Sequence, residues 1–368
     1  MKFHINKKVF DEALEVVSKY VDPISTFYSF RAIYINLSEN FITLKAANDS
    51  TSIVKKLVVD DTNIKVEQTG EFLIQANVFK NIIKKLSGFI TISKSGNNLL
   101  DIQEGNSRYQ ITTLNSSTFP ITDNLLNTKQ IEIDTNEFKK AIKSVNHASS
   151  QDNNLIYKCV NIKNKNGFIN FTATDSYRLA LYQMKNDLIL DDKMDISIVA
   201  KDLKDIVGID APKKITFFYN DIKVGVKYNN TTIISRIVSL NFKDTEPLFN
   251  EMKIKHAIQI EKNELNDLLN KIWIANGDKQ NRIELKVNNS LLQITNNISE
   301  IGLSTAKTEK FKFKGTNFDL DLNYVFLKDA ISVFDGEISI LIDESMKKIL
   351  IISNSNTFSK QLITPLRR

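Results

Sequence analysis

The sequence of 368 residues is poor in the residue types that build reactive sites: it has one cysteine, three histidines and one tryptophan. One cysteine excludes an intrachain disulfide framework and any metal site built from several cysteines. His4, His147 and His256 have no second histidine or cysteine at ligand spacing. We therefore expect no metal site, and we expect the histidines to be exposed or to cap helices. With only 11 glycines and 5 prolines, most of the chain should form helices and strands.

Catalytic motifs are also missing. The chain contains no glycine-rich phosphate loop and no G-x-S-x-G nucleophile motif. Cys159 lies in a strand-like run, which predicts a buried small hydrophobe rather than a nucleophile. The acidic pairs Asp60-Asp61 and Asp191-Asp192 are expected to be surface residues rather than a two-metal site. These absences favour a binding or scaffold protein over an enzyme, and no cofactor is expected.

Long apolar runs are absent as well. The N-terminus lacks the apolar core of a signal peptide, and no stretch approaches 18 uncharged apolar residues. We therefore expect a cytoplasmic protein without a membrane segment. The hydrophobic content of 42% and charged content of 25% are ordinary for globular proteins. The net charge of +6 permits a nucleic-acid partner without demanding one.

What the sequence does contain is a threefold repeat. Apolar residues recur at i, i+3, i+4 and i+7 in three segments that begin at Phe10, Phe138 and Leu265, which are 128 and 127 residues apart. Such a stripe predicts an amphipathic helix. A second set of apolar stripes begins at Phe79, Leu203 and Leu327, at offsets of 124 residues.

Alternating β-branched runs follow each predicted helix, for example at Phe41, Phe168 and Leu291 after the first helices. Period-2 alternation predicts half-buried antiparallel strands. Each third therefore reads as helix, strands, helix, strands, with a shorter second helix in the central third, where Asp210 interrupts the stripe. We predict an α+β fold of three related domains, over residues 1–124, 125–249 and 250–368.

Simple geometry limits how these helices could surround DNA. If six helices packed about 10 Å apart lined a ring, the circumference would be about 60 Å and the hole too small for a duplex. Twelve helices give about 120 Å and a hole of roughly 28 Å, which admits a duplex about 20 Å wide. A ring around DNA would therefore need two chains.

The segment Thr172-Ala-Thr-Asp-Ser-Tyr-Arg-Leu-Ala-Leu resembles the Ala-Thr-Asp-Gly-His/Tyr-Arg-Leu-Ala signature of the bacterial DNA polymerase III β subunit, the replicative sliding clamp. Residues 107–120, the segment from Ser235 to Asp244 and the C-terminal Leu362-Ile-Thr-Pro-Leu-Arg are similar to further segments of that family. The chain is identified as a member over its whole length.

The resemblance implies a fold of three clamp domains, half of a six-domain ring, in which domain 1 of one chain meets domain 3 of the other. It implies a DNA polymerase processivity factor without an active site of its own. The expected partners are duplex DNA bound without sequence specificity, a second copy of the chain, the α-type polymerase subunit, the clamp loader and other clamp-motif replication and repair proteins. The protein would work at the replisome in the cytoplasm, with no membrane partner.

The resemblance also implies a pocket between domains 2 and 3 that takes a Gln-x-x-Leu-Phe type of motif. The matching residues are Thr174, Ser176, Tyr177, Arg178, Leu179, Lys243, Leu248, Asn323, Phe326, Leu362, Thr364 and Leu366. The chain departs from the family at Ser176, Lys243 and Thr364, where glycine, proline and methionine are usual. The detailed pocket shape and motif preference could therefore differ from those of other members. Without the family, Leu362 and Leu366 would read as core residues of the last strand.

Two further surfaces are expected. Basic residues of the inner helices should contact phosphates without reading bases, and a solvated helix face is the alternative for each. The DNA-facing candidates are Lys80, Lys139, Lys140, Lys143, Gln151, Lys201 and Lys204, with Lys84 and Lys85 as further basic residues of the same helix as Lys80. The dimer-interface candidates are Phe79, Ile82, Lys84, Lys85, Leu86, Tyr109, Trp273, Ile274 and Glu300.

Two other classes of function compete with this interpretation. A nuclease or other DNA-processing enzyme is disfavoured because the sequence lacks a metal-ligand constellation. A repetitive surface or adhesive protein is disfavoured because the sequence lacks the signal peptide that export of such a protein would need.

Overall fold

The computed structural model describes residues 1–96, 98–120, 125–150, 154–185, 194–274, 280–299 and 301–367. Its longer helices are α1 (Lys7–Val17), α2 (Ala76–Lys85), α3 (Thr135–Asn146), α4 (Ala200–Asp205), α5 (Glu246–Asn250), α6 (Lys262–Ile272) and α7 (Tyr324–Ser332). No helix of the described chain is both long and apolar enough to cross a membrane.

The strands fall into three consecutive groups. The first group is β1 (Lys2–Asn6), β2 (Ala32–Leu37), β3 (Phe41–Ala47), β4 (Thr51–Val58), β5 (Ile64–Gln68), β6 (Gly70–Gln75), β7 (Phe89–Ser95), β8 (Leu99–Glu104) and β9 (Ser107–Thr112). The second is β10 (Lys129–Asp134), β11 (Cys159–Lys165), β12 (Phe168–Thr174), β13 (Arg178–Lys185), β14 (Asp195–Val199), β15 (Lys214–Tyr219), β16 (Lys223–Tyr228) and β17 (Thr231–Arg236). The third is β18 (Ile254–Glu261), β19 (Arg282–Val287), β20 (Leu292–Ile298), β21 (Gly302–Thr308), β22 (Phe311–Lys314), β23 (Phe318–Asn323), β24 (Glu337–Asp343), β25 (Ile349–Ser353) and β26 (Ser359–Ile363).

These elements confirm the threefold repeat. The stripes at Phe10, Phe138 and Leu265 lie on α1, α3 and α6, and the second set lies on α2, α4 and α7. As expected, α4 is the shortest of its set, with 6 residues against 10 and 9. It ends before Gly208, where an added Cβ would lie 2.0 Å from the Tyr228 hydroxyl oxygen. The sequence pattern missed one feature, since each third begins with a strand, β1, β10 or β18, before its first helix.

The chain divides into two compact units. Unit 1 comprises residues 1–136 and 205–237, and unit 2 comprises residues 137–204 and 238–368. The division between the units runs through the central third, because each unit contains a sheet with strands from two successive thirds. In unit 1 the strand order is β10-β15-β16-β17-β4-β3-β2-β6, and in unit 2 it is β14-β11-β12-β13-β26-β25-β24-β18-β22.

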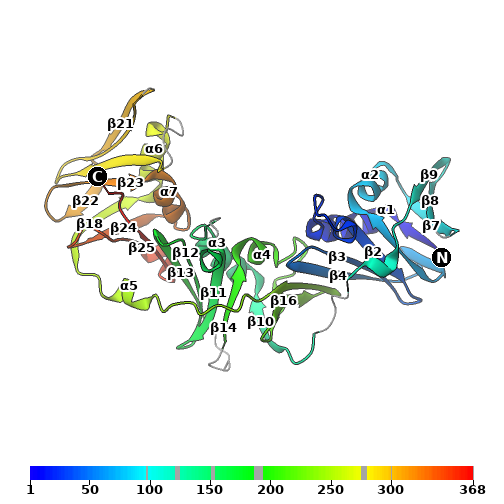
Figure 1. Cartoon of the computed structure of the whole chain (residues 1–368). Coiled ribbons are helices and arrows are strands. Elements are labelled where there is room, and N and C mark those ends of the chain that lie inside the picture. The colour runs from blue at the N-terminus through cyan, green and yellow to red at the C-terminus, as the bar shows by residue number, and fades with distance from the viewer. Residues whose placement is uncertain are drawn as a thin grey trace. The chain divides into compact units, whose positions relative to one another are not determined.

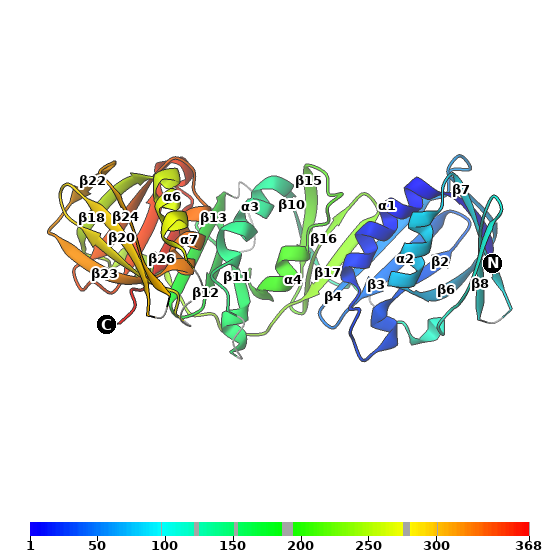
Figure 2. The same ribbon diagram turned by 90° about the horizontal axis from the view of Figure 1, so that it is seen from above.

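Each unit also has a smaller sheet, and the helix pair α1 and α2 lies in unit 1 whereas the pair α6 and α7 lies in unit 2. The smaller sheets are β5-β1-β7-β8-β9 in unit 1 and β21-β20-β19-β23 in unit 2. In unit 1, α1 and α2 lie side by side over β2 and β3 (Figures 1 and 2). The rings of Phe10 and Phe79 meet edge to face, with centroids 5.7 Å apart. The apolar stripes of α6 and α7 are likewise buried in the core of unit 2.

His256 differs from the expectation of exposed or capping side chains, whereas His147 directly follows α3 and its ring is hydrogen-bonded to the backbone of Lys143 in that helix. His256 on β18 is only 1% exposed and packs against Phe313 and Phe318. His147 accepts or donates a hydrogen bond of 3.0 Å to Gln361, and its pKa is lowered, chiefly because burial disfavours the charged ring. His4 lies nearer the surface and pairs with Glu67 at 2.7 Å. Cys159 is buried as predicted, and burial raises the pKa of its thiol to about 11.

Candidate functional sites

The signature segment forms a tight turn between β12 and β13. The Asp175 carboxylate accepts hydrogen bonds from the backbone N–H groups of Tyr177 and Arg178, at 3.0 and 2.9 Å. The Thr174 hydroxyl donates to the Arg178 carbonyl across the turn, at 2.7 Å. Ser176, where the family has glycine, adopts a φ of 75°. This left-handed conformation is one that glycine adopts without steric cost, so the turn keeps its geometry at some expense in strain.

Arg178 joins this turn to α7. Its Nε lies 2.8 Å from Asp175, and its Nη1 lies 2.7 Å from Asp329 on α7. The guanidinium also stacks over the Phe326 ring, 4.4 Å from the centroid. With both carboxylates and the ring engaged, the 12% exposed side chain positions the turn. Its predicted contact with a bound peptide stays a prediction.

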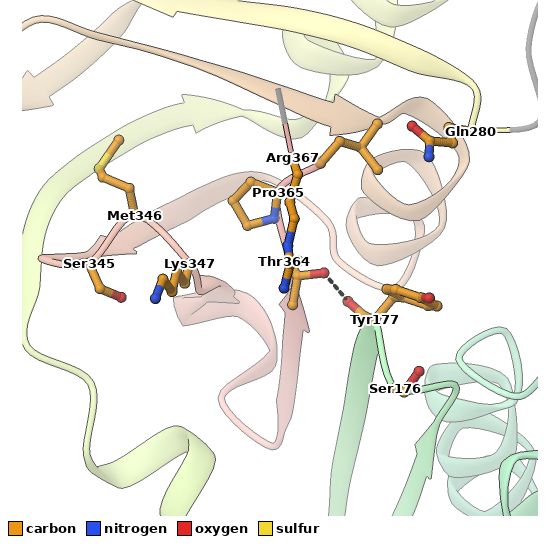
Figure 3. Close-up of a pocket in the computed structure, with 10 residues that line it drawn as sticks. Ser176, Tyr177, Gln280, Ser345, Met346, Lys347, Thr364, Pro365 and Arg367 are labelled. Atoms are coloured by element: carbon orange, nitrogen blue, oxygen red, sulfur yellow. Dashed lines mark hydrogen bonds between the residues drawn. The ribbon is translucent and has the colours of Figure 1, made fainter.

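Next to this turn lies a hollow of about 840 Å³ in unit 2. Figure 3 shows residues from four places around it: the signature turn, the turn between β24 and β25, the C-terminal segment, and Gln280 just before β19. Thr364 ties two of them together, since its backbone N–H and its hydroxyl both donate to the Tyr177 carbonyl, at 2.9 and 3.0 Å. The lining residues are Ser176, Tyr177, Gln280, Ser345, Met346, Lys347, Thr364, Pro365, Leu366 and Arg367.

Four of the twelve residues that the resemblance assigned to the pocket line this hollow: Ser176, Tyr177, Thr364 and Leu366. The remaining eight do not line it. Leu179 and Leu362 are buried together in an apolar cluster with Phe249, Leu181 and Leu350. Leu248, beside that cluster in the chain, is 42% exposed.

The other assigned residues have structural contacts of their own. The Asn323 side chain caps α7 by accepting a hydrogen bond of 3.0 Å from the Phe326 backbone N–H. Thr174 and Arg178 hold the signature turn, as described above. Lys243 lines a different and smaller hollow, of about 50 Å³, beside β11 and β12.

Sequence reasoning missed the turn between β24 and β25. Asp343 organises it by accepting hydrogen bonds of 2.8 Å from the backbone N–H groups of Lys347 and Lys348, and one from the Ser345 hydroxyl. Burial raises the pKa of Asp343, but these donors outweigh it and leave the pKa below its usual value. The turn places Met346 at a φ of 55° beside the hollow. An aspartate followed by a short polar run between two apolar strands was the available signal.

The DNA-facing candidates separate into two groups. Lys139, Lys140 and Lys143 on α3 and Lys201 and Lys204 on α4 are exposed. Lys80 on α2 is half-buried and pairs with Glu15 of α1 at 2.7 Å, and Lys84 pairs with the same carboxylate at 2.6 Å. These two lysines link α1 to α2, and the pair of contacts lowers the pKa of Glu15. Gln151 lies outside the described residues.

The dimer-interface candidates also separate. Phe79, Ile82 and Leu86 are buried inside unit 1, so they support α2 from within, while Lys85 is exposed. In unit 2, Trp273 stacks on Tyr324 with ring centroids 4.0 Å apart, and Ile274 is 43% exposed. Tyr109 is half-buried on β9. Glu300 lies outside the described residues. Each of these interface roles stays a prediction.

Among the described residues, no three histidine, cysteine, aspartate or glutamate side chains gather in a way that could hold a metal ion.

The repeated order of elements and the strand pairings between successive thirds define a clamp made of three α+β domains. Three domain families match the chain in succession: DNA polymerase III beta subunit N-terminal domain over residues 1–124, central domain over 132–244 and C-terminal domain over 252–367. The chain therefore belongs to the DNA polymerase III beta subunit family, as the signature segment indicated.

Individual relatives agree with this assignment. The chain is 29% identical to the beta sliding clamp of Mycoplasmopsis pulmonis and 26% identical to that of Bacillus subtilis, in each case covering the whole of both chains. The crystal structure of the DNA polymerase sliding clamp from Bacillus subtilis matches with a TM-score of 0.93 at 25% identity. It covers 100% of this chain and 99% of the other.

Proposed function

We propose that the chain is a DNA polymerase processivity factor, two copies of which form a closed ring around duplex DNA. The ring slides along DNA and holds the replicative polymerase and other clamp-motif proteins on it. We assign the chain no catalysis of its own. Its place of work is the cytoplasm, at the replisome, and its domains span residues 1–124, 125–249 and 250–368.

The strand pairing between successive thirds carries this proposal. The last strand of the central third, β17, pairs antiparallel with β4 of the first third. The last strand of the final third, β26, pairs in the same way with β13 of the central third. When the thirds are aligned on their helices and ladders, the two pairings have the same register. Thr232 stands opposite Val54, and the equivalent Lys360 stands opposite Leu181.

In the described chain, two strands lack the partner that their equivalents have: β9, which is equivalent to β17 and β26, and β21, which is equivalent to β4 and β13. β9 is the last strand of the first third and ends the five-stranded sheet, and β21 ends the four-stranded sheet. The shared register would set Arg108 opposite Thr305 and Tyr109 opposite Ser304. The exposures agree with this pairing, because Arg108 and Thr305 are both exposed whereas Tyr109 and Ser304 are both half-buried.

We infer that β9 of one copy pairs with β21 of another. A ring of three domains has too small a hole for a duplex, whereas two chains supply six domains and twelve helices. The Ser304 hydroxyl donates to the Ile272 carbonyl at 2.5 Å, just before Trp273. The pairing would therefore bring Tyr109 close to Trp273 and Ile274 of the second copy, in line with the interface expected from the sequence.

The described surfaces suit the other two partners. Exposed lysines on α3 and α4 offer phosphate contacts without base readout, which allows sliding and weakens as salt rises. The hollow beside the signature turn offers Tyr177, Met346, Pro365 and Leu366 as an apolar lining for a clamp-motif peptide of the polymerase, the clamp loader or a repair protein.

The decisive experiment combines the mass in solution with retention on DNA. We expect a dimer of about 84 kDa, twice the chain mass of 42.0 kDa. After loading, it should stay on closed circular DNA and slide off once the DNA is linearised. A monomer that binds circular and linear DNA equally would overturn the proposal. Magnesium-dependent release of nucleotides by the pure protein would favour a nuclease instead.

A further inference from the structure

The side chains that line the hollow beside the signature turn carry charge of one sign only. Of its ten lining residues, the only two with charged side chains are Lys347 and Arg367, and both are cationic. The rest of the lining is hydroxyl, amide or apolar. Within the part of the chain that the structure describes, neither cation has a carboxylate within ion-pair distance.

Four carboxylates near the hollow are already engaged by other donors. Asp175 and Asp329 both bind the Arg178 guanidinium, at 2.8 and 2.7 Å. Asp321 is held by Arg282 at 2.5 Å. Asp343 accepts the backbone and hydroxyl donors of its own turn. The charges of these four carboxylates are thus largely compensated inside the protein, whereas the two charged side chains of the lining itself are both cationic.

The backbones that carry the two cations are fixed. The Lys347 N–H donates to Asp343 at 2.8 Å. On the other side, the Leu366 N–H donates to the Asp321 carbonyl at 2.8 Å, and Arg282 donates to the Arg367 carbonyl at 3.2 Å. The two side chains therefore start from defined positions at the rim, which favours a ligand with charges at defined positions.

We propose that this pocket selects peptides that carry acidic side chains beside their apolar anchor residues. The inference rests on the proposed function, since it names the preferred chemistry of the partner motif. Complementary charge speeds the encounter and adds modest affinity at a solvated rim. Two partly solvated ion pairs should strengthen binding by roughly three- to tenfold at low salt.

The test compares two nine-residue peptides with the same Gln-x-x-Leu-Phe core, flanked on each side by aspartate in one and by asparagine in the other. Their dissociation constants are measured by fluorescence anisotropy on the full chain in 50 mM and 500 mM NaCl. The aspartate peptide should bind about three- to tenfold more tightly at low salt. The advantage should shrink at high salt, because ions screen exposed charges.

Variants then locate the effect. Lys347→Gln and Arg367→Gln should each lower the ratio of the affinities for the aspartate and asparagine peptides. Lys347→Glu should make a third, lysine-flanked peptide bind more tightly than the aspartate peptide. Glu344→Gln is the matched control, because this exposed carboxylate lies in the same turn but outside the lining, and it should leave the ratio high. Equal affinities of the two peptides at low salt would overturn the charge preference alone. Failure of both peptides to bind would overturn the peptide pocket itself.

Discussion

The two places where a sheet crosses between thirds have the same strand geometry but different contents. In both, the last strand of one third pairs antiparallel with a strand of the preceding third: β17 pairs with β4, and β26 pairs with β13. The two pairings have the same register. The β17–β4 crossing in unit 1 is fastened by polar groups. The β13–β26 crossing in unit 2 is packed with apolar side chains and lies beside a hollow. The backbone ladder therefore fixes how thirds connect, while the side chains decide what else a crossing can do.

The polar crossing is a closed network. Lys55 of β4 pairs with Asp210 at 2.6 Å and donates to the Thr231 hydroxyl at 3.2 Å. The Tyr228 hydroxyl donates to the same carboxylate at 2.9 Å, and the Tyr20 hydroxyl donates to the Asp205 carbonyl at 2.7 Å. Buried polar groups are costly unless they are paired, so this network favours one arrangement of the crossing.

One face of the β13–β26 crossing depends on packing instead, whereas Gln361 on the other face donates to the Ser144 carbonyl at 2.9 Å. Leu179 and Leu181 of β13 meet Leu362 of β26, with Phe249 against them. Apolar contacts are not directional, so they hold the strands without occupying the polar edges of the signature turn. Those edges stay available to line the hollow. A crossing that holds by packing can thus also serve as a binding site.

The largest expected effect comes from a pair of cysteines placed where β9 of one copy is proposed to pair with β21 of another. The register shared by the two internal crossings sets Gln110 of β9 opposite Leu303 of β21 in a second copy. Facing residues of antiparallel strands have Cβ atoms about 4.5–5.5 Å apart, close to disulfide range. The double variant Gln110→Cys with Leu303→Cys should therefore form covalent dimers under mild oxidation, measured by non-reducing electrophoresis.

The matched control shifts one partner by two residues on the same face of β21. Gln110→Cys with Thr305→Cys should form far less covalent dimer. Both positions are exposed, and the native Cys159 is buried, so reactivity alone does not separate the pairs. Similar yields from both pairs would show that the register does not extend to the pairing of β9 with β21.

Truncating the apolar crossing should have the next largest effect. Leu362→Ala removes a side chain that is 5% exposed and should lower the free energy of unfolding of this region by about 2–4 kcal/mol. Hydrogen exchange of the β13 and β26 amides measures it. Leu248→Ala, at a 42% exposed position beside the same cluster in the chain, should cost less than about 0.5 kcal/mol. Equal losses would mean that the cluster does not hold the crossing.

Breaking the polar crossing should have a smaller, pH-dependent effect. Burial raises the pKa of Asp210, but Lys55 and Tyr228 outweigh it and hold the pKa below the ordinary 3.8. A lowered carboxyl pKa stabilises the fold above the unfolded value, and this contribution is lost as pH falls through the folded value. Lys55→Gln should therefore cost about 1–2 kcal/mol at pH 6 and less below about pH 3.8, measured by denaturant unfolding.

The control for that experiment is an exposed ion pair. Lys163 and Asp195, whose side chains are 47% and 43% exposed, lie 2.8 Å apart, and Lys163→Gln should change stability by less than about 0.5 kcal/mol at either pH. A Lys55→Gln cost that is the same at pH 6 and pH 3 would contradict the role given to Asp210.

Local patterns predicted the parts of the fold that local physics determines. The stripes from Phe10, Phe138 and Leu265 gave all three first helices, because burying one face of a helix needs the i, i+3, i+4 spacing. The short strands before these helices were missed, because five to eight alternating residues that run directly into a helix give a weak signal. His256 was misjudged although it alternates with the buried Ile258 and Ile260 in one strand.

The site was less predictable because its parts are distant in sequence. Tyr177 and Thr364 meet only because β13 pairs with β26. Lys347 joins them because the turn between β24 and β25 comes to the same place. No periodicity links such positions. The family resemblance supplied the first two, through the signature segment and the C-terminal segment, and the turn was found only in the structure.

Because the sheets run across the boundaries between thirds, the thirds are not separable pieces. A fragment cut to the central third alone would lose β4 from beside β17 and β26 from beside β13. Each cut would uncover a row of backbone donors and acceptors that the whole chain keeps paired. Such bare strand edges are templates for unwanted association. The isolated central third should therefore self-associate or misfold, and the smallest unit that can be handled in solution should retain both neighbouring strands.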